Sequence, residues 1–181
     1  EPLLRARDDA LATVKWVAGF EFPDVEPDRV FLALSHPDEY AINEGTVRTD
    51  RGLDIPASAF EEHVREEHVA HSTALHATVD GEPYMVGPLA RYALNFAQLS
   101  PLAQEAARDA GLGPVERNPF KSIVVRAVEI VYACDEALRI IDQYEPPERA
   151  PKVTRPIDVA PFRRWMASAN SDSSLMGLVS S

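Results

Sequence analysis

The sequence contains a single cysteine, Cys134, among its 181 residues. A disulfide within the chain is therefore impossible, and so is a metal cluster held by several thiolates of this chain. It also has no run of about 18 apolar residues, the length that a membrane span requires, and no basic segment followed by an apolar stretch at its start, the mark of a signal peptide. The near absence of cysteine is typical of a reducing compartment, and we expect a cytoplasmic protein without a membrane span.

The sequence also lacks an excess of basic residues, since 29 acidic residues against 18 basic ones give a net charge of -11. Neutralising phosphates requires clustered lysine and arginine, so this charge argues against a nucleic-acid-binding protein. The charge is unevenly distributed: residues 1–145 carry -13 and residues 146–181 carry +2. We also find no internal repeat and no glycine-rich phosphate loop.

What is present is the composition of a folded domain. Hydrophobic residues make up 45% and charged residues 26%, which is close to the average of soluble globular proteins. A chain of this length can bury a sizeable core. It begins with Glu1 rather than Met, which suggests a processed or excised piece.

Apolar periodicity predicts helices in both halves of the chain. Residues 3–20 have apolar side chains at steps of three and four, and Gly19 then stops the pattern. Ser100 and Asn118 each precede a proline, which is a start signal with the proline at the first helical position. The helix after Asn118 is the longest, about 25 residues or roughly 37 Å. Its apolar stripe is wide, so we expect it to pack against something larger.

Strands are predicted between these helices. Residues 30–34 are an apolar run typical of a buried strand, and β-branched residues flank turn sequences at 50–52 and 80–81. Ser58 and Glu61 form a capping-box pattern that predicts a helix over residues 61–69. The predicted fold class is mainly α with small antiparallel β-hairpins, an α+β domain.

Three of the five histidines cluster in this predicted helix and just after it, at His63, His68 and His71. A zinc-binding helix needs two histidines four residues apart, with a glutamate between them. His63 and His68 are five apart, whereas His68 and His71 are three apart and could share one face. A small zinc hydrolase is therefore one hypothesis; surface histidines, with one buried and hydrogen-bonded, are the favoured interpretation.

Other reactive side chains have structural interpretations that we favour over catalysis. The glutamates near the histidines are typical of a solvated helix face, the cysteine lies on an apolar stripe where a buried, inert thiol is expected, and the serine has no nucleophile elbow around it. These residues are Glu61, Glu62, Glu66, Glu67, Cys134 and Ser72.

Several stretches resemble, in order, the central part of [NiFe]-hydrogenase large (alpha) subunits, most closely the cytoplasmic NAD(P)-linked and sulfhydrogenase-type members. The most specific is residues 84–95 (YMVGPLARYALN), preceded by HSTA at residues 71–74 and followed by a helix that contains RAVE. The likeness covers roughly residues 1–148. The stretches are DEY…EG at 38–45, HSTA at 71–74, YMVGPLARYALN at 84–95, LSPLA at 99–103, NPF at 118–120 and VRAVEIVYA at 125–133.

The resemblance implies a partial large-subunit fold, largely helical. Such subunits reversibly split H2 at a nickel–iron centre with CN and CO ligands, held by two Cys-x-x-Cys motifs, and they pair with an iron–sulfur small subunit. Neither motif is present here, and Cys134 matches neither. The resemblance therefore implies a fragment or truncated homologue that is inactive alone and whose partners are the small subunit and the remainder of the large subunit. The alternative is a non-catalytic scaffold or binding module that kept the central fold.

The resemblance also assigns roles to individual residues. The family binds Mg or a similar ion, supported by a mid-chain glutamate, for which Glu44 is the candidate; an ordinary turn carboxylate before Gly45 is the competing interpretation. His71, Gly87, Pro88 and Arg91 match family motifs and are expected to hold the structure together. A buried arginine at position 91 requires a carboxylate partner, which the sequence does not identify.

The likeness ends near Pro147. We predict that residues 149–181 form a Pro/Ser-rich tail that is atypical of the family and is a linker or disordered.

Overall fold

The computed structural model describes residues 1–146, and residues Glu1–Tyr144 form one unit that contains both helices and strands. The predicted α+β class is confirmed. The predicted tail at 149–181 lies outside the described residues. In chain order the elements are α1 (Pro2–Ala18), β1 (Val30–Ser35), β2 (Thr46–Thr49), β3 (Asp54–Ile55), α2 (Phe60–His63), β4 (Val64–Glu67), β5 (His76–Val79), β6 (Glu82–Met85), α3 (Pro88–Asn95), α4 (Pro101–Asp109) and α5 (Ser122–Asp142).

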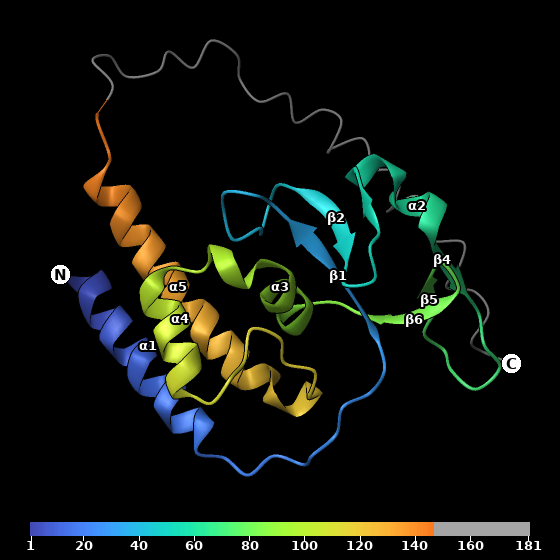
Figure 1. Ribbon diagram of the computed structural model, residues 1–181, viewed down its shortest axis with the longest axis horizontal. Helices are drawn as coiled ribbons and strands as arrows, with labels where there is room; N and C mark the ends of the chain where they lie inside the picture. Colours follow the sequence, from blue (N-terminus) through green and yellow to red (C-terminus); the bar gives the residue numbers. More distant parts are fainter. Residues whose placement is uncertain (147–181) are drawn as a thin grey trace, which may run out of the picture. The chain divides into compact units, whose positions relative to one another are not determined.

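Four helices form the larger part of the core. Figure 1 shows α1, α4 and α5 side by side, and α5 contacts all three of α1, α3 and α4. The start signals predicted from sequence are present: Ser100 Oγ accepts a hydrogen bond from Ala103 N, and Asn118 Oδ1 accepts one from Phe120 N. In the second case a short 3-10 turn, Pro119–Lys121, precedes the α-helix. The Ser100 cap fixes where α4 begins, and the Asn118 cap fixes the start of the 3-10 turn that leads into α5.

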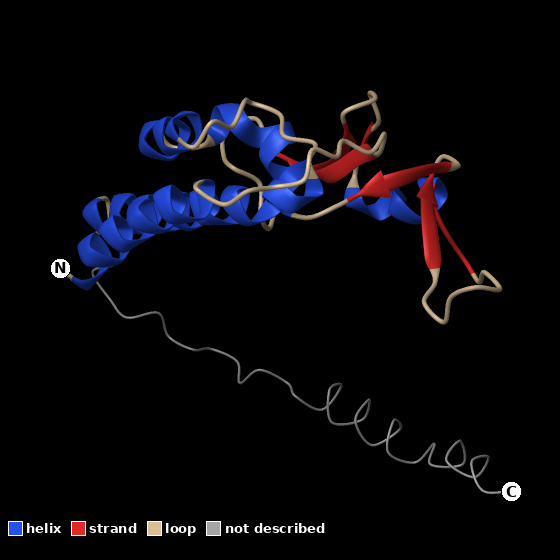
Figure 2. Ribbon diagram, turned by 90° about the horizontal axis from the view of Figure 1, so that it is seen from below, coloured by secondary structure: helices blue, strands red, loops and turns tan. Residues whose placement is uncertain are grey.

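The strands form one six-stranded mixed sheet in the order β3-β2-β1-β6-β5-β4. Both predicted hairpins are present, and glycines with φ of 103° (Gly52) and 84° (Gly81) make their turns. The prediction of separate small hairpins was incomplete, because β1 and β6 pair in parallel and join them. Figure 2 shows the strands on one side of the helical part, and α3 contacts both β1 and α5.

The prediction of a helix over residues 61–69 was wrong. The helix α2 ends at His63, and Val64–Glu67 is strand β4, paired antiparallel with His76–Val79. Ala59 rather than Ser58 precedes α2, and no side chain caps it. The run of glutamates looks helical by propensity, but backbone pairing with β5 decides the conformation, as tertiary contacts often override propensity.

The predicted apolar stripe of the long helix α5 is buried in its N-terminal half, at Val124, Ala127 and Val131, together with neighbouring side chains. Val125 and Tyr132 are buried, whereas Ile123 and Ile130 are about half exposed, at 43% and 51%. The apolar stripe is as wide as predicted. On the side that carries Ile123 and Ile130, however, the described residues leave it about half exposed. Among these residues, no helix is long and apolar enough to cross a membrane.

Candidate functional site

The start of α3 positions the arginine of the most specific motif. Gly87 has φ of 90°, a conformation that favours glycine, and Pro88 occupies the first helical position. The carbonyl of Gly87 accepts a hydrogen bond from Arg91 N at 2.9 Å. This first turn places Arg91 on the face of α3 that meets α5.

Arg91 forms a bidentate ion pair with Glu129 of α5. Its Nε donates to Oε1 at 2.7 Å and its Nη2 donates to Oε2 at 3.1 Å. The Glu129 side chain is 16% exposed and that of Arg91 is 30% exposed. The hydrogen bond to Glu129 raises the pKa of Arg91 above its ordinary value. Paired forks of this kind are among the stronger polar contacts in proteins.

Tyr40 adds a third member to this cluster from the loop between β1 and β2. Its hydroxyl donates to Glu129 Oε1 at 2.7 Å, and its ring lies 5.0 Å from that of Tyr132. Burial raises the pKa of Tyr40 well above its usual value, and the negative charge of Glu129 raises it further. The phenol therefore stays protonated and serves as a donor.

Asn95, one turn beyond Arg91, ties the same helix to the sheet. Its Nδ2 donates to the carbonyls of Leu34 and Arg91, both at 2.9 Å. Its Oδ1 accepts a hydrogen bond from His36 N at 3.4 Å. Asn95 is fully buried, so each of these hydrogen bonds offsets the desolvation of a polar group.

The chemistry of this cluster is that of a closed clamp. Glu129 accepts three hydrogen bonds from Arg91 and Tyr40. A general base needs a free lone pair within reach of a substrate proton, and three of the roughly four acceptor positions of this carboxylate are already occupied. We will call Tyr40, Arg91 and Glu129 the carboxylate clamp.

Two residues singled out in the sequence lie away from the clamp. Glu44 is exposed, in the turn before Gly45, whose φ is 134°. His71 is exposed in the β4–β5 connection, where its ring lies against that of His76.

The three clustered histidines do not come together. His63 Nδ1 lies 2.9 Å from Asp80 Oδ1, while His68 and His71 follow β4 rather than share a helix face. Among residues 1–146, no group of three or more His, Cys, Asp or Glu side chains converges on a point where a metal could bind. The zinc hydrolase hypothesis assumed that His68 and His71 share one face of a helix. Because the helix ends at His63, they do not.

The remaining candidates have ordinary surroundings. The side-chain hydroxyl of Ser72 accepts a hydrogen bond from Ala74 N within its own turn. Cys134 is half-buried on α5 rather than fully buried as expected. Glu61, Glu62, Glu66 and Glu67 are all exposed.

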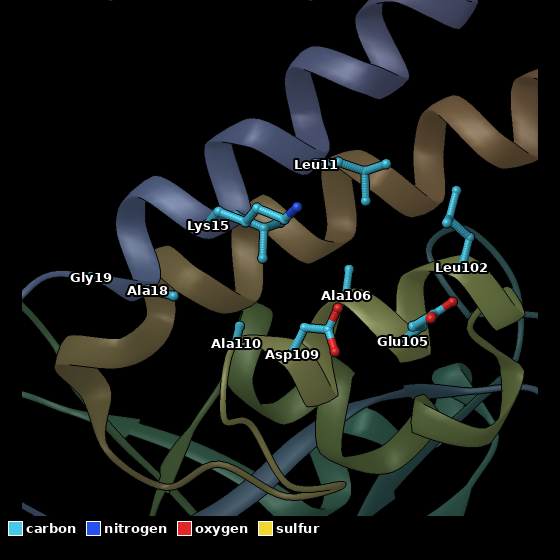
Figure 3. Close-up of a pocket in the computed structure, with 10 residues that line it drawn as sticks. Leu11, Lys15, Ala18, Gly19, Leu102, Glu105, Ala106, Asp109 and Ala110 are labelled. Atoms are coloured by element: carbon cyan, nitrogen blue, oxygen red, sulfur yellow. The ribbon is translucent and has the colours of Figure 1, made fainter.

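A groove of about 470 Å³ runs between α1 and α4. Figure 3 shows Leu11 and Lys15 of α1 on one side and Glu105 and Asp109 of α4 on the other. Its floor is made of alanine and leucine side chains, and none of the motif residues described above lines it. The groove is therefore separate from the carboxylate clamp.

Comparison with known proteins identifies a relative of this chain. The chain is 30% identical over 127 residues to the sulfhydrogenase 1 subunit alpha of Pyrococcus furiosus, an alignment that covers 68% of this chain. The chain is hydrogenase-related. It spans only 29% of the length of that relative. No protein-family model matches the chain.

Three of the six hydrogenase-like stretches that are scattered along the sequence meet in the clamp. Tyr40, Arg91 and Glu129 come from three of them. Sequence reasoning missed Glu129 as the partner of Arg91, although a signal was available: it is the sole acidic residue between Glu116 and Asp135, in the mostly apolar first half of a predicted helix.

Proposed function

We propose that this chain is a central, scaffold-forming portion of a hydrogenase-type large subunit, in which it supports a catalytic centre that other residues hold. The observation that carries the proposal is the carboxylate clamp. Glu129 of α5 binds Arg91 of α3 and Tyr40 of the β1–β2 loop, so three of the hydrogenase-like stretches are joined by one polar contact. That arrangement supports a structural role for them.

The residues present do not fit the nickel–iron centre of the family. That centre needs four cysteine thiolates, and this chain has Cys134 alone. Cys134 lies on α5 in a hollow whose other lining residues are Leu3, Arg126, Glu129, Ile130 and Ala133, so no second thiolate is beside it. In this proposal the chain alone does not split H2.

Glu44 has one property that a supporting carboxylate for a magnesium site needs. The turn that carries it is fixed, because a side chain at Gly45 would clash with the backbone of Ser35. Glu44 itself is exposed. A single carboxylate supplies too few oxygens for Mg²⁺, so in this proposal the ion's other ligands come from elsewhere in the subunit.

The uncovered side of α5 indicates where the rest of the subunit packs. On α5, Ile123 and Ile130 are 43% and 51% exposed, and Phe120 of the preceding 3-10 turn is 51% exposed. Ile130 also lines an apolar hollow of about 520 Å³ with Ala133 and Cys134. Exposed apolar side chains on one helix mark an interaction surface, and in this proposal the remainder of the large subunit covers it. The parent enzyme's second partner is the iron–sulfur small subunit.

A stand-alone, non-catalytic scaffold module is the second candidate. It is favoured by the self-contained core of Glu1–Tyr144, in which 19 buried residues from the four main helices, the first strand and the loops between elements form one cluster. Such a module would not need the missing parts of a large subunit.

The association state of the purified full chain separates the two candidates. We expect the wild-type chain to self-associate as its concentration rises in light-scattering chromatography, and Ile123→Ser with Ile130→Ser to restore a monomer. Val115→Ser is the matched control, because Val115 is 50% exposed but does not lie on α5. A wild-type chain that stays monomeric and unfolds cooperatively would favour the stand-alone module.

The catalytic part of the proposal has its own test. The same purified chain, produced in a host that matures hydrogenases, should reduce no viologen dye under H2 and should contain no stoichiometric nickel. H2-dependent dye reduction together with bound nickel would overturn the proposal that the chain is scaffold.

A further inference from the structure

Two imidazole rings lie together in the connection between β4 and β5. The ring centroids of His71 and His76 are 5.2 Å apart and their planes meet at 83°. Both residues are exposed. Within residues 1–146 neither ring forms a side-chain hydrogen bond, in contrast to His63, which is held by Asp80.

The backbone, rather than a helix, sets this spacing of five residues. His76 opens β5 and pairs with Glu67 of β4 in antiparallel register. The chain between them turns back where Ser72 N donates to the carbonyl of Val69 at 3.3 Å and Ala74 N donates to Ser72 Oγ at 3.1 Å. These turns bring the ring of His71 against that of His76, the first residue of β5.

The separation of the rings matches that of two imidazoles on one metal ion. With Zn–N bonds of about 2.0–2.1 Å and tetrahedral angles, the centroids of two coordinating imidazoles lie about 5 Å apart. Neutral imidazole is a preferred ligand of zinc, nickel and copper ions. Because the two rings already lie against each other, little rearrangement of the connection is needed for both to reach one ion.

We propose that His71 and His76 bind one divalent transition-metal ion of the imidazole-preferring class. Because no third His, Cys, Asp or Glu converges with them among the described residues, water completes the coordination. Glu67, opposite His76 in the ladder, adds a nearby negative charge that favours a cation. This site is independent of the proposed function and of the carboxylate clamp.

Calorimetric titration of the full chain with ZnCl2, and separately with NiCl2, tests the site. We expect one ion per chain, with affinity reduced at least tenfold by His71→Ala and by His76→Ala. His68→Ala is the matched control, because it is an exposed histidine of the same connection outside the pair, and Cys134→Ser checks for a thiol contribution. Both control variants should bind like the wild-type chain.

Two results would overturn the proposal. One is a wild-type chain that binds neither ion; the other is undiminished binding by the His71→Ala, His76→Ala double variant. Both histidines are exposed, so we expect unchanged circular dichroism from these variants, and a folding defect in either single variant would itself contradict a site built only from surface side chains. Weaker binding by His68→Ala than by His76→Ala would assign the ion to a different pair.

Discussion

Glu129 accepts hydrogen bonds from both Nε and Nη2 of Arg91, at 2.7 and 3.1 Å, across 38 positions of sequence. The pair joins α3 to α5, and through Tyr40 it also holds the loop that follows β1.

Replacing Glu129 with Gln should lower the free energy of unfolding by about 3 kcal/mol, because it leaves the largely buried Arg91 without a counter-charge. Urea unfolding measures the change. Glu136→Gln is the matched control on the same helix: its partner Arg139 is exposed, and exposed ion pairs contribute little. Equal losses in the two variants would contradict a special role for Glu129.

The phenol of Tyr40 should contribute less than the ion pair. Tyr40→Phe keeps the ring against Tyr132 and removes one hydrogen bond to Glu129, so we expect a loss of about 1–2 kcal/mol in the same urea assay. Tyr144→Phe, at a tyrosine that is 64% exposed, should have no measurable effect. A Tyr40→Phe variant as stable as the wild type would remove Tyr40 from the clamp.

Stability should fall as the pH rises above about 10. Burial raises the pKa of Tyr40, Tyr92 and Tyr132 in the folded chain, whereas the unfolded chain releases these protons near the ordinary value of 10.0. Unfolding is therefore favoured above that pH, and the three tyrosines contribute no such pH dependence below it.

Denaturant titrations across this alkaline range, with phenolate absorbance recorded in parallel, measure the effect. Tyr40→Phe should lose stability less steeply with pH than the wild type, because one of the three protons is gone. Identical slopes would show that Tyr40 ionises alike in both states.

The turn that carries Glu44 should tolerate no side chain at Gly45. A Cβ there would clash with the carbonyl of Ser35, and φ is 134°, so Gly45→Ala should destabilise by about 2–3 kcal/mol. At Gly113 an added Cβ meets nothing closer than 3.6 Å, and Gly113→Ala should be near neutral in thermal unfolding. Comparable losses at both glycines would show that the Glu44 turn is not constrained.

Local signals in the sequence were enough for much of the fold. The caps at Ser100 and Asn118 and the turn glycines Gly52 and Gly81 each act within a few residues, and the helices and hairpins that they predict are present. Local signals do not predict which strands pair when the strands are far apart in the sequence. The parallel pairing of Val30 with Tyr84 is such a case.

The same distinction applies to the candidate site. Arg91 was expected to need a carboxylate, but nothing near it in the sequence identifies Glu129, because the two meet only when α3 packs on α5. His71 and His68 were paired on the assumption of a helix, and the strand β4 instead brings His71 against His76. Side-chain partners across elements depend on packing, which periodicity does not specify.

The coupling between Arg91 and Glu129 tests the account most directly. A double-mutant cycle would use Arg91→Met, Glu129→Gln and the variant with both changes, with the free energy of unfolding measured for each. We predict a coupling energy of about 3 kcal/mol, with the double variant no less stable than either single one. Additive losses, with coupling below about 0.5 kcal/mol, would contradict the carboxylate clamp as the contact that holds the hydrogenase-like stretches together.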